Sequence, residues 1–212
     1  MYELCPETPA DTPEVEALLD LCFAPGRTAL SSYRLRDGVA PVLPLCLMLR
    51  NEYRVPVGAI RYWPVRIGAW PVLLLGPIAV HPTTQGEGLG ALLMRESLER
   101  ALALGWERVM LVGDLPYYGR FGFSRLEGVE MPPPTNPDRV LGLELRPGAW
   151  QGVHGLVERI AVAAGDAARA GDDRAPATGD EDGAGAGNGT GNGTGNGDAA
   201  PAGHRARTGS AG

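Results

Sequence analysis

A cluster of three glycines stands where a strand pattern gives way to a helix pattern, in the stretch HPTTQGEGLGALLMRESLERA, residues 81–101. The first backbone N–H groups of a helix have no intrahelical acceptor, and the helix dipole places partial positive charge on them. A preceding loop without Cβ atoms lets a phosphate or pyrophosphate approach those groups closely. The sequence therefore predicts an anion site built from consecutive loop residues, which are Gln85, Gly86, Glu87, Gly88, Leu89 and Gly90.

The spacing of these glycines argues against two familiar nucleotide sites. A P-loop needs Gly-x-x-x-x-Gly followed by Lys and then Ser or Thr, and neither residue type stands at the required place. A dinucleotide-binding loop needs Gly-x-Gly-x-x-Gly, whereas the spacing here is Gly86-x-Gly88-x-Gly90. On the loop alone, a surface turn that caps the helix and binds nothing is the remaining alternative.

The elements around the loop alternate between strand and helix patterns, which predicts an α/β or α+β domain with a mixed sheet. Strands are expected at residues 2–6, 44–51, 55–66, 70–80, 107–114 and 139–147. Helices are expected at residues 11–23, 28–37, from the glycine loop to Gly105, within 116–123, and at 149–163. The apolar face of the helix after the loop comprises Leu93, Met94, Ser97, Leu98, Ala101 and Leu104.

The composition predicts one packed domain and a tail. The chain has 212 residues, of which 44% are hydrophobic and 21% charged. We expect the domain to cover residues 1–162, and residues 163–212 to be a disordered low-complexity tail rich in Gly, Ala, Asn and Asp. The formal net charge of -6 argues against a protein that binds nucleic acid through its bulk charge.

The cysteines and the apolar runs favour a cytoplasmic chain with no membrane partner. Cys5, Cys22 and Cys46 form no Cys-x-x-Cys pair and have no histidine at metal-ligand spacing, so free thiols and no metal site are expected. The longest apolar run, residues 70–80, is interrupted by prolines and is too short to span a bilayer. The N-terminus has no basic region followed by an apolar core, as a signal peptide would have.

The glycine loop and a second motif resemble the two signatures of the GNAT superfamily of acetyl-CoA-dependent N-acyltransferases. The first signature, Gln/Arg-x-x-Gly-x-Gly/Ala, is matched by Gln85, Gly88 and Gly90 within IAVHPTTQGEGLGALLM. The second, a tyrosine followed after three residues by Gly-Phe, is matched by YYGRFGF, in which the tyrosine is Tyr118. The separation of the motifs and the preceding Gly-Asp look most like the YhbS-like branch, with good similarity over residues 40–145.

The resemblance implies a mixed, mostly antiparallel central sheet, flanked by helices and splayed at the strand before the loop. The pantetheine arm of acetyl-CoA would lie in that gap and hydrogen-bond to the main chain of Ile78, Ala79 and Val80. The Ile78 amide would stabilise the developing oxyanion, and the amides from Gly86 to Gly90 would bind the pyrophosphate. The implied reaction is direct attack of a primary amine on the acetyl thioester, without an acyl-enzyme and without a metal.

The resemblance also makes Tyr118 the general acid that protonates the thiolate of coenzyme A. A phenol has a pKa of about 10 and a thiol about 8.5, so the transfer is feasible. The group that accepts the amine's proton is left open between His81, a bound water, and an amine that arrives neutral. Tyr117 is expected to be a packing residue or part of the substrate wall. Position 111, where many relatives carry an Asn that contacts pantetheine, is a Leu.

Three questions about ligands stay open on the sequence. Arg120 and Arg125 either contact the cofactor phosphates or are solvated surface residues. A non-catalytic acyl-CoA-binding or regulatory module is the competing function, because the strand before the loop lacks a carboxylate, and a nucleotide-binding protein is a third. The acceptor is expected to be a small-molecule, peptide or protein amine, selected by the N-terminal helical part and the loops near Trp63, Trp70 and residues 132–134. Either a monomer or a homodimer is compatible with the sequence.

Overall fold

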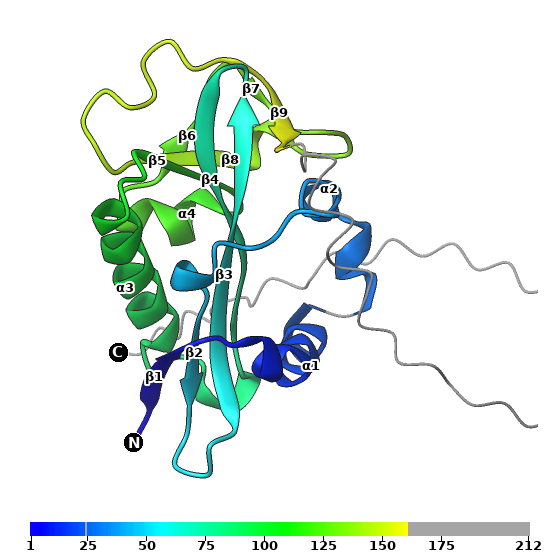
Figure 1. Ribbon diagram of the computed structural model, residues 1–212, viewed down its shortest axis with the longest axis vertical. Coiled ribbons are helices and arrows are strands. Elements are labelled where there is room, and N and C mark those ends of the chain that lie inside the picture. The colour runs from blue at the N-terminus through cyan, green and yellow to red at the C-terminus, as the bar shows by residue number, and fades with distance from the viewer. Residues whose placement is uncertain (24, 161–212) are drawn as a thin grey trace, which may run out of the picture. The chain divides into compact units, whose positions relative to one another are not determined.

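Apolar runs form the strands of one sheet, and segments with a single apolar face form the helices that lie against it (Figure 1). The structure is a computed structural model that describes residues 1–23 and 25–160, so the expected tail, 163–212, lies outside the described residues. The strands are β1 (Glu3–Pro6), β2 (Leu47–Arg50), β3 (Pro56–Ile67), β4 (Trp70–Val80), β5 (Arg108–Val112), β6 (Ser124–Arg125), β7 (Val129–Glu130), β8 (Val140–Glu144) and β9 (Gly155–Arg159). The α-helices are α1 (Thr12–Phe23), α2 (Ser31–Arg34), α3 (Leu89–Ala103) and α4 (Leu115–Tyr118).

The sheet is mixed and mostly antiparallel, as predicted. Its strands follow the order β1-β2-β3-β4-β5-β8-β6, with β9 on β3 and β7 on β9. The parallel pairs in the described residues are β4 with β5 and β7 with β9. β3 and β4 form the long central hairpin, and Gly68 supplies the positive φ of 56° that its turn requires.

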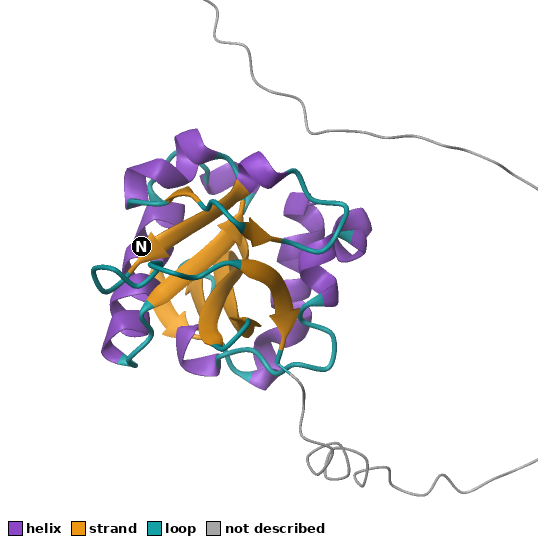
Figure 2. Ribbon diagram, turned by 90° about the horizontal axis from the view of Figure 1, so that it is seen from above, coloured by secondary structure: helices purple, strands orange, loops and turns teal. Residues whose placement is uncertain are grey.

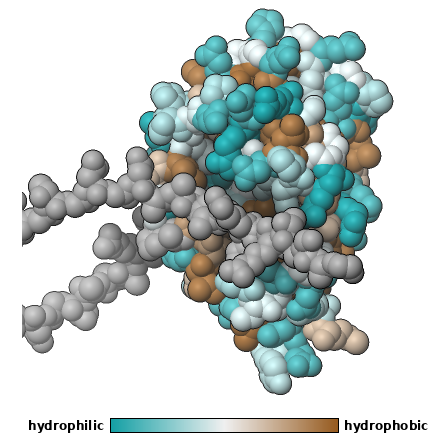
Figure 3. Space-filling view, turned by 180° about the vertical axis from the view of Figure 1, so that it is seen from behind, coloured by the Kyte–Doolittle hydropathy of each residue, from teal (hydrophilic) through white to brown (hydrophobic). Residues whose placement is uncertain are grey.

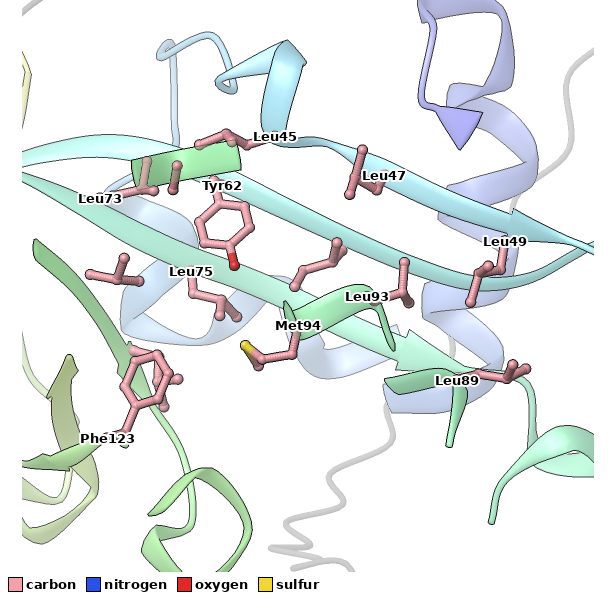
Figure 4. Close-up of a cluster of buried hydrophobic side chains, with 14 of the residues drawn as sticks. Leu45, Leu47, Leu49, Tyr62, Leu73, Leu75, Leu89, Leu93, Met94 and Phe123 are labelled. Carbon is pink, nitrogen blue, oxygen red and sulfur yellow. The ribbon is translucent and has the colours of Figure 1, made fainter. Parts of the chain in front are cut away.

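Helices cover both faces of the sheet (Figure 2). Successive side chains of a strand point to opposite faces. In β2, Leu47 and Leu49 pack into the cluster beneath α3, whereas Met48 packs with α1 on the other face. The leucine-rich cluster beneath α3, which also contains Tyr62 and Phe123, fills the space between that helix and the strands (Figure 4). The two helical layers therefore fix β3 and β4 from both sides.

α3 buries the face that its sequence predicts. Leu93 and Met94 are fully buried against the sheet. The Ser97 hydroxyl lies on the same face and shares a hydrogen bond of 2.8 Å with the Tyr62 hydroxyl, so both buried polar groups are paired. Leu104, predicted on this face, is 52% exposed because it is the C-cap residue beyond the last turn.

Residues 149–163 were predicted as a terminal helix; residues 149–160 contain β9 instead, so the helix prediction is wrong there, and residues 161–163 lie outside the described residues. β3 extends beyond β2, and its residues Val65–Ile67 pair with β9, where Val157 is buried. Gly152 and Gly155 have φ values of 74° and 116°, which no right-handed helix contains. The free edge of β3 therefore selects a strand at this end of the described chain.

The described helices do not meet the requirements for crossing a membrane. Each described helix falls short of the length and apolar character needed to cross a membrane. On the visible part of the face turned away in Figure 1, hydrophilic residues surround separate hydrophobic ones (Figure 3). Single exposed apolar residues such as Leu102, which is 44% exposed, are ordinary at protein surfaces.

The packing of α3 on the sheet predicts a large difference between two leucines of the same helix. Leu93→Ala, at a fully buried position, should lower the free energy of unfolding by about 2–5 kcal/mol, because it removes packed methyl groups and leaves a cavity. The matched control Leu102→Ala, at a partly exposed position, should change it by about 0.5 kcal/mol or less. Urea denaturation of both variants measures this, and equal losses would contradict the assigned helix face.

Candidate active site

β4 carries a bulge in its middle. The register of the β3–β4 pair shifts between Ile60 and Tyr62, so that Gly76 and Pro77 of β4 lie opposite the single residue Arg61. Pro77 has no N–H to donate to a neighbouring strand, and a bulge is one of the few positions within a sheet that accept such a residue. The bulge therefore bends β4 at a point where its main chain leaves regular pairing.

β4 and β5 separate next to this bulge. In the described residues the two strands pair in parallel at Leu73 with Val109 and at Leu74 with Met110. β4 remains paired with β3 as far as Val80. The edge of β4 that faces β5 is therefore open from the bulge to the end of the strand, which is the splay that the sequence resemblance implied.

The direction of the main-chain groups at this edge follows from one hydrogen bond. The N–H of His81 donates to the carbonyl of Val57 on β3 at 2.8 Å. Because successive residues of an antiparallel strand point their main-chain groups alternately to either side, Ala79 also faces β3. Ile78 and Val80 face the open edge. Of the three residues predicted to contact the cofactor through their main chain, Ile78 and Val80 have N–H and C=O groups on the open edge. The N–H and C=O groups of Ala79 point to β3 instead.

The glycine loop folds back onto the end of β4. Nε2 of Gln85 donates to the carbonyl of Val80 at 3.2 Å. Gly86 and Gly88 have φ values of 91° and 83°, a left-handed conformation that glycine adopts with little strain. The side chain of Glu87 is exposed and accepts a hydrogen bond of 2.7 Å from the hydroxyl of Tyr2. The carboxylate in the loop is therefore directed toward the N-terminal strand.

The N-terminus of α3 presents free amides beside the open edge. Gly88 is the N-cap residue, and the N–H of Leu92 donates to its carbonyl at 3.0 Å. The N–H groups of Leu89, Gly90 and Ala91 precede this bond and have no acceptor within the helix. The Leu89 side chain is buried, so this residue offers its main chain alone. Free amides of this kind can donate hydrogen bonds to an anion.

Tyr118 is the last residue of α4, and its ring packs directly on Gly113. A Cβ atom at Gly113 would lie 2.3 Å from the ring, so glycine is required for this position of the phenol. Burial raises the pKa of Tyr118 to about 12, which keeps the hydroxyl protonated at physiological pH. Within the described residues this hydroxyl forms no hydrogen bond, and Tyr118 lines the same cavity as Gly76 and Ile78.

Tyr117 and the two candidate arginines occupy different surroundings. A Cβ atom at Gly90 would lie 2.9 Å from the Tyr117 hydroxyl, so this side chain packs over the first turn of α3. Arg120 stacks on the Tyr117 ring at 4.1 Å and borders a groove of about 470 Å³ along α3. Arg125 is exposed and pairs with Asp138 at 3.3 Å. Arg120 is therefore the better placed of the two arginines for a ligand at α3.

His81 and Leu111 lie outside the cavity beside Tyr118. Nδ1 of His81 is 2.8 Å from the Thr83 hydroxyl and accepts from the Thr83 N–H at 3.3 Å. The imidazole therefore caps the 3₁₀ turn Pro82–Thr84. Leu111 is buried in the cluster beneath α3. Neither side chain is among the residues that line the cavity at Tyr118.

Two adjoining cavities continue from Tyr118 past the bulge. The first has a volume of about 120 Å³ and the second about 380 Å³. They share four residues in their walls, which are Arg27, Tyr33, Arg36 and Pro77. The second is also lined by Trp63, one of the aromatic residues expected near the acceptor. Trp70 lies instead at the hairpin end of β4 and is 43% exposed.

The cavity wall contains a charge network that the sequence motifs did not identify. Glu7, 8% exposed, accepts two hydrogen bonds from Arg61 at 2.8 and 2.5 Å. Glu16 bridges Arg61 and Arg27, and Arg27 also binds Asp20 at 2.8 Å. Burial alone would raise the pKa of Glu16, but its two arginine partners outweigh burial and lower it. The sequence feature that could have indicated this network is Arg61, a charged residue within the apolar run of residues 55–65.

The cysteines are free thiols without activation. Burial raises the pKa of Cys46 to about 11, and burial also raises the pKa values of Cys5 and Cys22. A reactive cysteine needs a lowered pKa, so none of the three is set up as a nucleophile. Among the residues that the structure describes, no group of three or more His, Cys, Asp or Glu side chains is placed to hold a metal ion.

Known proteins are similar to this chain in sequence and in architecture. Residues 12–123 match the Acetyltransferase (GNAT) family. The uncharacterized N-acetyltransferase YhbS of Escherichia coli K12 is 31% identical over 121 residues, which cover 56% of this chain and 71% of that protein. The crystal structure of E. coli YhbS in complex with CoA has a TM-score of 0.65 at 28% identity and covers 75% of this chain and 89% of that one. A GNAT family acetyltransferase from Brucella melitensis in complex with acetyl-CoA has a TM-score of 0.59 at 28% identity and covers 76% and 97%.

The contact between Gly113 and Tyr118 predicts that a single methyl group disturbs this site. Gly113→Ala should destabilise the fold by about 1–3 kcal/mol, because the new Cβ overlaps the phenol ring. Gly119→Ala is the matched control: its Cβ would meet its nearest neighbour at 3.7 Å, and it should be neutral or stabilising by up to about 1 kcal/mol. Urea denaturation and the near-ultraviolet circular dichroism of tyrosine report the change, and equal stability of the two variants would contradict the packing.

Proposed function

The chain belongs to the GNAT family of acetyltransferases, and from this premise we propose that it transfers an acetyl group from acetyl-CoA to a primary amine by direct attack. The observation that carries the proposal is the open edge of β4, which runs from the free amides of α3 to the cavity at Tyr118. A ligand with an anionic end and an extended amide-bearing arm fits an edge of this kind. The cavity beyond Tyr118 supports an enzyme over a non-catalytic acyl-CoA-binding module.

The proposed position of acetyl-CoA follows from the main-chain groups. The pyrophosphate lies on the amides of the loop and first turn of α3, from Gln85 to Ala91. The pantetheine arm extends along β4 and bonds to the main chain of Ile78 and Val80, which face the open edge. Arg120 borders the groove along α3 and is assigned to the nucleotide end of the cofactor.

The proposed reaction is a single displacement. The lone pair of the amine attacks the thioester carbon, the C–S bond breaks, and the leaving thiolate takes the phenolic proton of Tyr118. The Ile78 N–H, on the open edge, stabilises the negative charge that develops on the carbonyl oxygen. The proton that the amine nitrogen loses passes to solvent, from which the Tyr118 phenolate regains one. The products are the N-acetylated amine and coenzyme A with a free thiol.

We assign the amine's proton to solvent because the described carboxylates that line the cavity are already bound by arginines. Glu16 is held by two arginines that lower its pKa. Glu7 is bound by Arg61 through two hydrogen bonds. The lowered pKa gives Glu16 little affinity for a proton from an ammonium group, and both carboxylate oxygens of Glu7 already accept hydrogen bonds from Arg61.

Binding of the cofactor tests the loop. Acetyl-CoA and CoA should give measurable heat in isothermal titration calorimetry, and ATP should not. Gly88→Ala should weaken acetyl-CoA binding about 10-fold, because a Cβ at a φ of 83° costs about 1–2 kcal/mol and disturbs the N-cap. Gly105→Ala is the matched control, since it places the same strain, at a φ of 85°, at the opposite end of α3. Equal losses of affinity in both variants would refute a cofactor site at the loop.

Tyr118→Phe tests the general acid. It should lower kcat about 100-fold or more, the ordinary contribution of general acid catalysis, and leave acetyl-CoA affinity close to wild type. Tyr117→Phe, which removes the neighbouring hydroxyl that packs over α3, should retain most of kcat. Thiol release across a panel of amines is the assay. Unchanged turnover in Tyr118→Phe would remove the acid assignment while the family membership stood.

The pH dependence of the same variant follows from the raised pKa of Tyr118. With a pKa of about 12, the phenol stays protonated, and so remains competent as an acid, throughout the range from about pH 7 to 10. The ratio of wild-type to Tyr118→Phe rates should therefore be constant over that range. A ratio that collapses with a midpoint near pH 10 would show that burial does not hold the phenol in its protonated form.

A further inference from the structure

An unpaired guanidinium lies in the wall that the two cavities share. Nε and Nη1 of Arg36 are buried and have no hydrogen-bond partner among residues 1–23 and 25–160. Buried donors are nearly always paired, so an exception requires a physical reason. Burial without a counterion lowers the pKa of Arg36 to about 10, which still leaves it charged at physiological pH.

The neighbouring acidic groups are already engaged. Glu7 and Glu16 line the larger cavity, and both are bound by Arg61 or Arg27. Asp20 is bound by Arg27. Among the described side chains that form this wall, Arg36 is thus the cation left without a carboxylate.

Two aromatic rings hold the Arg36 guanidinium in place. Its central carbon lies 4.3 Å from the ring centre of Tyr33 and 4.7 Å from that of Trp63. The Trp63 indole N–H donates to the carbonyl of Val39 at 3.1 Å, and a Cβ at Gly76 would lie 2.4 Å from its ring. The rings are themselves fixed, so the cation is positioned before any ligand binds.

Arg36 and the proposed transfer site face one cavity. The smaller cavity is lined by Arg36, Tyr118 and Ile78, and the larger one continues from Arg36 toward Trp63. A molecule that reaches Tyr118 with its amine therefore lies in a cavity that is also lined by the Arg36 guanidinium.

We propose that the acceptor is an amino carboxylate, whose carboxylate pairs with Arg36 while its amine lies at the Tyr118 end of the cavity. This assignment rests on the proposed acetyltransfer. One guanidinium matches a single negative charge, and a phosphate dianion would need further cations, whereas Arg27 and Arg61 are committed to carboxylates of the protein. A polyamine would place a second positive charge against Arg36 and is disfavoured.

Paired acceptors test the proposal. A panel of α-amino acids and straight-chain ω-amino acids is assayed for thiol release with acetyl-CoA, each against its own amide, which has the same shape and no negative charge. At least one acid should exceed its amide about 10- to 100-fold in kcat/KM, which is the range expected for a buried hydrogen bond to a charged group.

Variants of two neighbouring arginines show whether Arg36 causes this preference. Arg36→Gln should reduce that ratio to about one, because the acid loses its charged partner and its kcat/KM falls more than that of the amide, and Arg36→Lys should restore part of the preference. Arg34→Gln, which removes an exposed arginine two residues away, should keep the wild-type ratio.

Folding and the transfer reaction are followed separately. Thermal unfolding and calorimetric binding of acetyl-CoA show whether Arg36→Gln is intact, and a merely structural arginine would lower the rates with acid and amide equally. If amines are acetylated but acids and amides react alike, the carboxylate assignment is overturned and the acetyltransferase proposal stands. If no acceptor is acetylated, isothermal titration of the same acids into the complex of the protein with CoA tests whether the cavity binds a carboxylate. Binding that Arg36→Gln abolishes supports the anion site without the transfer, and no binding of any acid overturns it.

Discussion

The parting of β4 from β5 is the constraint on which the rest of this structure depends. Main-chain groups within a sheet need partners, and a strand that loses one neighbour is usually an exposed edge. Here β4 stays ordered because β3 pairs with it along the opposite side and helices cover both faces. The main-chain groups of Ile78 and Val80 are thereby held in a fixed direction, and in the described part of the chain no strand pairs with them on that side. A ligand with amides of its own can take that place.

The elements at the two ends of this edge complete the site. α3 begins where β4 and its loop end, so its free amides lie at one end of the edge. The bulge at Gly76 and Pro77 lies at the other, next to the cavity at Tyr118. Alternation along β3 directs Ile60 and Tyr62 into the cluster beneath α3 and Arg61 to the other face, where it binds Glu7 and Glu16 and joins the strand to the N-terminal segment. The bulge in β4 thus lies between the two parts of the proposed site. The gap for the cofactor opens on one side of it, and the cavity for the acceptor lies on the other.

Local patterns were sufficient to predict most of the fold. The central hairpin, the buried strand at residues 107–114 and the helix after the glycines each carry their own periodicity and their own turn residues. Residues 149–163 do not: their apolar spacing fits more than one element, and the free edge of β3 decides in favour of a strand. That edge exists because β2 is shorter than β3, a fact that no window around residue 149 contains.

The residues of the proposed site likewise fall into those that local sequence motifs identify and those that only the fold brings together. The glycine loop and Tyr118 could be located from sequence because each belongs to one contiguous motif. Glu7, Glu16 and Arg36 could not, because they come from separate segments and acquire a meaning only where the fold brings them to one cavity. Whether Arg36 has a hydrogen-bond partner depends on all the side chains that surround it in the folded cavity wall, so it cannot be read from Arg36 or its sequence neighbours.

The packing of Tyr118 on Gly113 has an evolutionary consequence. These two positions, five apart in the chain, cannot drift independently, since any side chain at the first displaces the aromatic ring at the second. The close contacts are with ring carbons, so a lineage is released from the glycine only when it loses the aromatic ring at position 118, and alanine at position 113 would displace that ring. If Tyr118 is the proton donor, homologues that carry a side chain at position 113 should have lost the phenol from this place in the fold.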